Sequence, residues 1–453
     1  MDKSVSEQLA EFVVHIQFED LPPSVIERTK MCLLDFLGSI FAGIHTDSIK
    51  ILVETIKELG GTPESTIIGE RAKTSSLLAA FCNAAAGHVI EMDDLHRASI
   101  LHPGAPVIPA ALAIAEREKK SGKELILAIV VGYEVAIRIG EAVGPSHYEF
   151  WHTTGTCGTF GAAIAAGKQL GLDAQQIVAA LGSAGTQAAG LWEFLADGAM
   201  SKQLHTGKAA MNGVLAALLA QKGFTGARKI LEGEKGFLRA MSTGYALSKI
   251  TDKLDPSLGE FKIMSDSFKP HAACRHTHSA IDATLELVKK YNLKPNEVQE
   301  ICVQIYSGAF ELLNDITPTT PYAAKFCMPF CVASALKHRA VGFASFTPQV
   351  LKDLEIQHVM TKVRVEKDPV LDKEYPEKWP AIVKIKTRKG DMFVAKVEHP
   401  KGDPENPMTT EEIIAKFQEL TGSSIPTDRK ERLIHQILTL DEIVDANNLF
   451  ETI

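Results

Sequence analysis

The densest group of reactive side chains lies in the segment GHVIEMDDLHRASILHPGAPVIPAAL, residues 87–112. Within twelve residues it holds three carboxylates, two histidines and one arginine: Glu91, Asp93, Asp94, His96, Arg97 and His102. Because charges beside apolar helices are costly unless paired, the segment is a candidate acid–base cluster whose members tune one another's pKa values. A solvated loop with ordinary ion pairs would give the same pattern. Zinc or manganese could also bind such ligands, but no HExxH motif or repeated cysteine pair is present, so we predict no metal.

A second candidate, EFWHTTGTCGTFGAAIAAGKQLGL, places His152 directly before a turn rich in glycine and threonine, including Thr156, that runs into a helix. The glycines do not form a phosphate-binding loop, because Gly161 to Gly167 is one residue too long for GxxxxGK and Gln169 stands where Ser or Thr would hold magnesium. No convincing strand precedes them, which argues against a dinucleotide fold. The helix start is suited to binding a carboxylate, although close helix packing by Gly and Ala would explain the glycines as well.

Two further segments are basic. In DGAMSKQLHTGKAAMNGVLAALLA a long apolar helix opens with Lys202, His205 and Lys208. A lysine there could pair with a substrate carboxylate or snorkel to the surface. In SFKPHAACRHTHSAIDA, residues 267–283, cationic and imidazole groups gather: Lys269, His271, Arg275, His276 and His278. One cysteine with two of these histidines is a weak zinc signal, so convergence on an anion fits better.

Composition limits the classes of protein. A formal net charge of −8 makes a nucleic-acid or anionic-membrane partner unfavourable. The 453 residues, 45% of them hydrophobic, indicate a folded globular chain that is too long for one core, so we expect two domains. Seven scattered cysteines are typical of a reduced, intracellular protein. The acidic N-terminus does not resemble a signal peptide, and ELILAIVVGYEVAIRI carries two glutamates, so we expect a cytoplasmic protein outside the membrane.

The elements that must position these side chains change in type near residue 260. Before it, apolar residues recur at helical spacing, and the segments 105–119, 124–143, 158–171 and 205–222 have the composition of helices packed against helices. After it, alternation predicts strands in QEICVQIYS, VMTKVRVEKD, AIVKIKT and MFVAKVEH, the last two joined as a hairpin. Helical spacing returns in EEIIAKFQEL, which Thr410 can cap. We therefore expect a mainly α protein: a helical domain over 1–265, an inserted α+β domain over 266–402, and a helical tail over 403–453.

These segments, in this order, resemble the MmgE/PrpD family of 2-methylcitrate dehydratases and cis-aconitate decarboxylases. The resemblance rests on MCLLDFLGSIFAG, EMDD with LHPGA, WHTTGTCGTFGAA, SKQLHTGKAA, FKPHAACRHTHSAIDA and DPENPMTTEEI, which together cover nearly the whole chain. It implies a homodimer, a helical domain with a smaller lid domain, an active site between them, a small carboxylate substrate, and no metal or organic cofactor.

The resemblance also implies a set of site residues. Six positions match the family's motifs: Glu91, His102, His152, Lys202, Lys269 and His278. Glu91 stands where the family usually has Asp, and Leu95 stands where aconitate decarboxylases have Thr. With the neighbouring Asp93, we expect His102, His152, Glu91, Lys202 and His278 to be catalytic. For substrate binding we expect Lys269, Arg275, Arg97 and Thr156.

A carbanion or enolate-like intermediate beside a carboxylate is common to the family's reactions. We expect Lys202, Lys269 and the helix start after His152 to hold substrate carboxylates, and His102, oriented by Glu91 and Asp93, to move the proton at carbon. A dehydratase also needs an acid for the leaving hydroxyl, for which His152 or His278 could serve. The sequence favours a dehydratase, ahead of a decarboxylase, with an epimerase on the same fold or a silent binding protein as alternatives.

Overall fold

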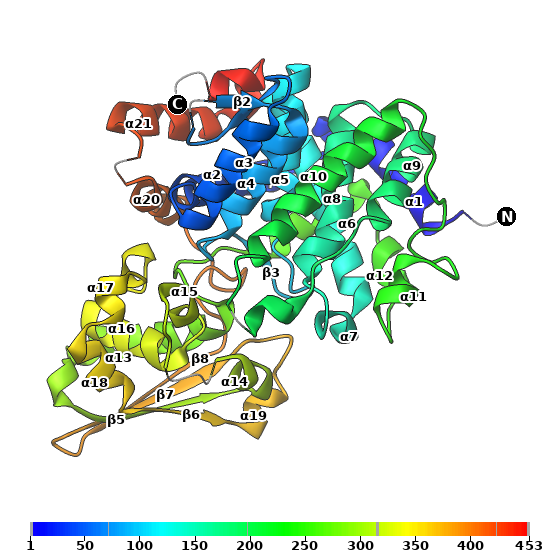
Figure 1. Ribbon diagram of the computed structural model, residues 1–453. Coiled ribbons are helices and arrows are strands. Elements are labelled where there is room, and N and C mark those ends of the chain that lie inside the picture. Colours follow the sequence, from blue (N-terminus) through cyan, green and yellow to red (C-terminus); the bar gives the residue numbers. More distant parts are fainter. Residues whose placement is uncertain (1–2, 71, 197, 314–316, 423, 451–453) are drawn as a thin grey trace. The chain divides into compact units, whose positions relative to one another are not determined.

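The computed structural model describes residues 3–70, 72–196, 198–313, 317–422 and 424–450 (Figure 1). It divides into two compact units, the first formed by residues 1–266 and 409–453 and the second by residues 267–408. Each unit is described by itself. Within the described residues, no single helix is both long and apolar enough to cross a membrane, and one pair of helices bent by 88° passes that test jointly by length and composition alone.

The first unit is a bundle of helices. Its helices are α1 Val5–His15, α2 Pro23–Gly43, α3 Asp47–Leu59, α4 Ser76–His88, α5 Gly104–Glu118, α6 Gly122–Val143, α7 Pro145–Tyr148, α8 Thr153–Gln169, α9 Ala174–Gly185, α10 Lys202–Gln221, α11 Phe237–Met241, α12 Ser248–Thr251, α20 Thr410–Thr421 and α21 Thr427–Leu438. Its short strands are β1 Ser65–Ile67, β2 Ala72–Thr74 and β3 Leu95–His96, and β4 Asp266–Ser267 lies at the boundary of the units. The β1–β2 hairpin is a small addition to the all-helical half that the sequence predicts.

Helix α8 lies at the centre of this bundle, packed against α5, α6, α9 and α10. Small residues allow this close approach, as the Ala- and Gly-rich sequence indicates. A Cβ atom at Gly161 of α8 would lie 2.6 Å from the Cβ of Ala136 on α6, and one at Gly213 of α10 would lie 2.5 Å from the Cβ of Ala162. Both positions therefore exclude larger side chains, and α8 is held rigidly where its first residues border the polar segment of residues 89–103.

The second unit contains a mixed sheet with the strand order β6-β5-β7-β8. Its strands are β5 Val298–Ile305, β6 Val363–Lys367, β7 Ala381–Thr387 and β8 Met392–Val397, and its helices are α13 His278–Tyr291, α14 Ser307–Leu313, α15 Pro321–Ala324, α16 Met328–His338, α17 Pro348–Leu351, α18 Leu354–Met360 and α19 Pro369–Asp372. Strand β5 runs parallel to β6 and antiparallel to β7, and the predicted β7–β8 hairpin is confirmed. In β7 buried residues alternate with partly exposed ones, because α13 covers one face.

Helix α20 brings the chain back to the first unit, where it packs against α2. Its N-cap is Thr409, whose side chain accepts a hydrogen bond from the backbone of Glu412, while Glu412 reaches back to the backbone of Thr409. The prediction that Thr410 caps this helix is wrong by one residue, because the capping box requires the glutamate three residues after the cap and only Thr409 has that spacing.

Candidate active site

The polar segment between α4 and α5, residues 89–103, is tied down at both ends. Asp94 closes it onto α5: its Oδ1 accepts from the backbone N–H of Gly104 at 3.1 Å, and its Oδ2 accepts from the Tyr133 hydroxyl at 2.5 Å. A Cβ atom at Gly104 would lie 2.7 Å from Asp94 Oδ1, so this contact requires glycine. The anchoring fixes the backbone on either side of His102.

The tail helix α20 holds the same segment from another side. The buried Lys416 Nζ lies 2.6 Å from the Met92 carbonyl oxygen and 2.6 Å from Asp35 Oδ1. Burial raises the pKa of Asp35 to about 6, and the charge of Lys416 opposes that rise. A residue from the end of the chain thus fixes the backbone immediately before Asp93.

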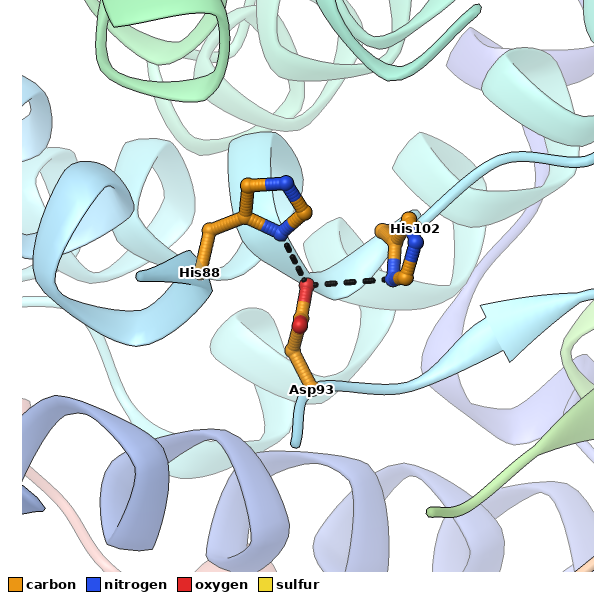
Figure 2. A group of neighbouring side chains, drawn as sticks. All are labelled: His88, Asp93 and His102. Atoms are coloured by element: carbon orange, nitrogen blue, oxygen red, sulfur yellow. Dashed lines mark hydrogen bonds and ion pairs between the residues drawn. The ribbon is translucent and has the colours of Figure 1, made fainter. Parts of the chain in front are cut away.

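Asp93 joins two histidines in a buried group (Figure 2). Its Oδ2 lies 2.7 Å from Nδ1 of His88, the last residue of α4, and 3.2 Å from Nδ1 of His102. The His102 Nδ1 also lies 2.7 Å from the Asp94 carbonyl oxygen. A carbonyl oxygen only accepts, so Nδ1 of His102 carries a proton, and in the neutral ring Nε2 holds the lone pair. Carboxylate and carbonyl together fix the tautomer of His102.

The electrostatics favour an ionised Asp93 beside a neutral His88. Burial by itself raises the pKa of Asp93, but His88 and His102 more than offset this and hold that pKa well below its usual range. Burial lowers the pKa of His88, against the opposing charge of Asp93. Among the described residues, Asp93 Oδ1 and His88 Nε2 are buried without a hydrogen-bond partner. Such atoms are costly in a folded protein and are typical of functional sites.

The same three side chains have the composition of a two-histidine, one-carboxylate metal site, and their donor atoms lie within 4.8 Å of one another. The hydrogen bonds account for this proximity without an ion. The His102 Nδ1 faces an atom that can only accept, so that nitrogen is a donor and not a ligand. We therefore describe His88, Asp93 and His102 as a hydrogen-bonded acid–base group.

Glu91 and Lys202 form a buried ion pair in the same unit. Lys202 is the first residue of α10, and both side chains are at most 5% exposed. Glu91 adopts the left-handed backbone conformation with φ 60°, which is uncommon for a residue with a side chain and costs about 1 kcal/mol. The sequence predicts that Glu91 and Asp93 both orient His102; in the structure Asp93 contacts His102, and Glu91 forms an ion pair with Lys202.

His152 is the N-cap residue of α8 and is 2% exposed. Its backbone N–H donates to the Gly190 carbonyl at 2.9 Å, and its Nδ1 lies 3.2 Å from Nδ1 of His205 on α10. Its ring centroid lies 5.6 Å from that of His88 and 6.5 Å from that of His102. Burial, then the charge of Lys202, holds the pKa of His152 well below its usual range. His152 therefore belongs to one group of imidazoles with His88 and His102.

Two predicted binding residues, Thr156 and Arg97, lie in the first unit. Thr156 on α8 contacts Nε2 of His147 through its hydroxyl at 2.8 Å. The threonine in contact with His102 is Thr154, whose Oγ1 accepts from the His102 backbone N–H at 3.1 Å. Arg97 lies in the turn closed by the backbone pairing of His96 with Leu101, and it contributes, after burial and Lys262, to lowering the pKa of His96 to about 3.

The remaining predicted residues form a basic cluster in the second unit: Lys269, Arg275 and His278, all buried. Arg275 donates to Asp403 Oδ1 at 2.5 Å and to Nδ1 of His278 at 2.9 Å. The lone pair of His278 thus lies on Nδ1, and its Nε2 lies 3.2 Å from the Ala273 carbonyl. Burial, then the charge of Arg275, holds the pKa of His278 well below its usual range.

Sequence reasoning missed His88 and Thr154, and it noted His205 only as a basic residue at the start of a helix. His88 lies in the same segment as Asp93, five residues earlier, but at the end of an alanine-rich helix where it resembles a core residue. His205 shares a helical turn with Lys202, and Thr154 lies two residues before Thr156. Only the packing of α4, α8 and α10 brings these two rings and the Thr154 hydroxyl to His102 and His152.

Comparison with known proteins gives the same family as the motifs. The MmgE/PrpD N-terminal domain matches residues 7–249, and the MmgE/PrpD C-terminal domain matches residues 271–442. The chain is 27% identical over 472 residues to the cis-aconitate decarboxylase-like protein oryM of Aspergillus oryzae, covering 99% of this chain and 97% of that protein. It is also 27% identical to the cis-aconitate decarboxylase of Aspergillus terreus over 468 residues, covering 99% of this chain and 95% of that protein. The identity to the cis-aconitate decarboxylase of Homo sapiens is likewise 27%, over 472 residues, covering 99% of this chain and 94% of that protein. The chain therefore belongs to the MmgE/PrpD family, whose enzymes are lyases acting on carboxylates.

Proposed function

We propose that this protein decarboxylates cis-aconitate or a close tricarboxylate analogue. The observation that carries the proposal is the buried group in which His88 and His102 contact Asp93 and the His152 ring stacks on His88, with the Lys202–Glu91 pair in the same unit. The sequence alone favours dehydration, but the relatives are named cis-aconitate decarboxylase or decarboxylase-like protein and match over 97% and 95% of their length, which favours decarboxylation.

Each part of the group has a place in this reaction. Loss of one carboxyl group as carbon dioxide leaves a carbanion whose electron pair spreads onto a neighbouring carboxylate. Lys202 and the start of α8 would hold the substrate carboxylates. A protonated His102, balanced by Asp93, would donate from Nε2 to the carboxylate that takes up charge, and His152 would deliver a proton to carbon.

The basic cluster of the second unit is proposed as a carboxylate-binding element, with Lys269 supplying the charge and Arg275 fixing the His278 tautomer. Lys269→Met should then raise KM for a tricarboxylate at least tenfold, because one charge-assisted hydrogen bond contributes about 1.5–3 kcal/mol. An unchanged KM would remove Lys269 from the proposal.

Dehydration of a 2-methylcitrate-like substrate is the second candidate, and the tautomer of His102 favours it. With Nδ1 protonated, the neutral ring presents a lone pair at Nε2, as a base that removes a proton from carbon requires. The two reactions require different roles of His102. Dehydration and epimerisation need His102 as a base, whereas decarboxylation needs a proton donor.

Proton NMR in deuterated water separates the candidates. We expect cis-aconitate to lose a carboxyl group and to give an itaconate-like product that carries one deuterium. New alkene signals from 2-methylcitrate or citrate would instead establish dehydration, and deuterium uptake into an unchanged skeleton would establish an epimerase. His152→Asn is the matched variant, because Asn is a favoured N-cap residue and should preserve the start of α8, where His152 is the N-cap. A decrease in kcat of about 10²-fold or more is expected, as for loss of a positioned acid.

The absence of a cofactor, the homodimer and the cytoplasmic location remain predictions. Retention of activity after chelation and dialysis tests the first. Analytical ultracentrifugation of the purified protein tests the second, and fractionation of the source cells tests the third.

A further inference from the structure

His205 contacts His152, the proposed proton donor, but the proposed reaction gives His205 no role. It lies in the first turn of α10, three residues after Lys202, and its ring is half-buried. His152 is 2% exposed and His88 is fully buried. The side chain of His205 is therefore the more accessible end of a contact that leads inward to His152.

The space for the His205 ring is made by two glycines. A Cβ atom at Gly190 would lie 3.1 Å from Cγ and 3.2 Å from Nδ1 of His205, and one at Gly155 would lie 3.1 Å from its Cβ. The carbonyl of Gly190 also accepts from the backbone N–H of His152 at 2.9 Å. The same backbone segment thus positions both rings, with Phe194 packed on His205 at a centroid distance of 5.6 Å.

The contact between the two rings requires one donor and one acceptor. Their Nδ1 atoms lie 3.2 Å apart, so one ring must carry its proton on Nδ1 and the other must present a lone pair there. Burial, then the neighbouring charges, keeps both rings neutral: the pKa of His205 is lowered to about 4, and that of His152 lies well below its usual range. Each neutral ring holds one proton, as a hydrogen-bonded relay needs.

Decarboxylation creates the need for such a relay. A tricarboxylate that loses carbon dioxide and gains hydrogen at carbon consumes one proton from water in each turnover. Dehydration releases and returns its own proton and has no such net demand. A donor that is almost wholly buried must therefore be recharged from outside after each decarboxylation.

We propose that His205 relays protons from solvent to His152. This inference rests on the proposed decarboxylation and deepens it. In each cycle Nε2 of His152 gives its proton to the substrate carbanion, a C–H bond forms, and Nδ1 of His152 receives the proton held between the two Nδ1 atoms. Nε2 of His205 then takes a proton from water or buffer, so one proton enters at His205 for each one that leaves at His152. Both rings exchange tautomers in this step, and rotation of the rings restores the starting arrangement.

The test compares His205→Asn with the wild type and with His435→Asn, a substitution on the exposed side of α21. Asn keeps a polar atom near the Nδ1 position but cannot pass a proton through a ring. We expect kcat of His205→Asn on cis-aconitate to fall about 10²-fold with little change in KM. Added imidazole should raise its rate in a saturable manner, while the wild type and His435→Asn stay indifferent to imidazole. A loss of activity that imidazole does not restore, or no loss, would overturn the relay.

A second measurement does not depend on turnover. With ¹⁵N-labelled histidine, the wild type should show one strongly deshielded imidazole proton coupled to two Nδ1 atoms, and His205→Asn should lack it. Absence of this resonance in the wild type would overturn the relay. A wild type that shows the resonance but leaves cis-aconitate unchanged would overturn the proposed substrate while supporting the hydrogen bond on which the relay depends.

Discussion

Replacing Asp93 by Asn tests the centre of the proposed site, because it removes the charge and keeps the shape. The amide oxygen can occupy the position of Oδ2, between Nδ1 of His88 at 2.7 Å and Nδ1 of His102 at 3.2 Å. The amide nitrogen then takes the place of Oδ1, which is buried and has no hydrogen-bond partner among the described residues. The unsatisfied position thus exists in both proteins, and the difference is the lost charge. Because hydrogen bonds to charged groups contribute about 1.5–3 kcal/mol, weakening the contacts with His88 and His102 should lower the free energy of unfolding by about that amount.

The effect on catalysis follows from what remains around His102. The Asp94 carbonyl, 2.7 Å from Nδ1, still fixes the tautomer, so the loss is limited to the charge-assisted contact with Asp93. Such contacts contribute about 1.5–3 kcal/mol, which corresponds to a decrease of about 10- to 150-fold in kcat. A loss of about 10⁴-fold would mean that the carbonyl does not hold the tautomer.

Initial rates on cis-aconitate by proton NMR, with urea unfolding of the same samples, measure both quantities. Asp428→Asn is the control, since that carboxylate is 72% exposed and neither quantity should change. A folded Asp93→Asn variant with wild-type kcat would refute the reasoning that Asp93 supports His102.

Three further predictions concern other parts of the first unit. Lys202→Met should lower the free energy of unfolding by about 3–5 kcal/mol, because the buried Glu91 loses the charge opposite it, and the double variant with Glu91→Gln should recover part of that loss in urea unfolding. Burial first, then Lys262 and Arg97, lowers the pKa of His96 to about 3. The unfolded chain therefore binds an extra proton below about pH 6.5, whereas the folded chain does not. The free energy of unfolding thus decreases as the pH is lowered, by about 2 kcal/mol from pH 7 to pH 5 for this group alone. His96→Asn should show a shallower decline by that amount, and an unchanged slope would contradict the assignment. Activity should survive chelation and dialysis, and a loss that zinc or manganese restores would show that a metal is required.

Much of the fold could be predicted from local patterns. Periodicity located α5, α6, α8 and α10, and alternation with a four-residue turn located the β7–β8 hairpin, because helices and strands impose spacings that sequence records directly. The cap of α20 was misplaced by one residue, since Thr409 and Thr410 are both good caps and only the position of Glu412 decides between them.

The sequence by itself determined which segments carry chemistry, since a cluster of carboxylates and histidines in residues 87–112 is visible without a fold. Only the tertiary structure decided the partners. Asp93 contacts His102, and Glu91 pairs with Lys202, 111 residues away. His88 joins the group although it resembles an ordinary helix residue in sequence, and His205 joins it through its contact with His152. The physical reason is that hydrogen bonds and ion pairs act over about 3 Å in space. Which residues come that close depends on how α4, α8, α10 and α20 pack, and no local spacing encodes that packing.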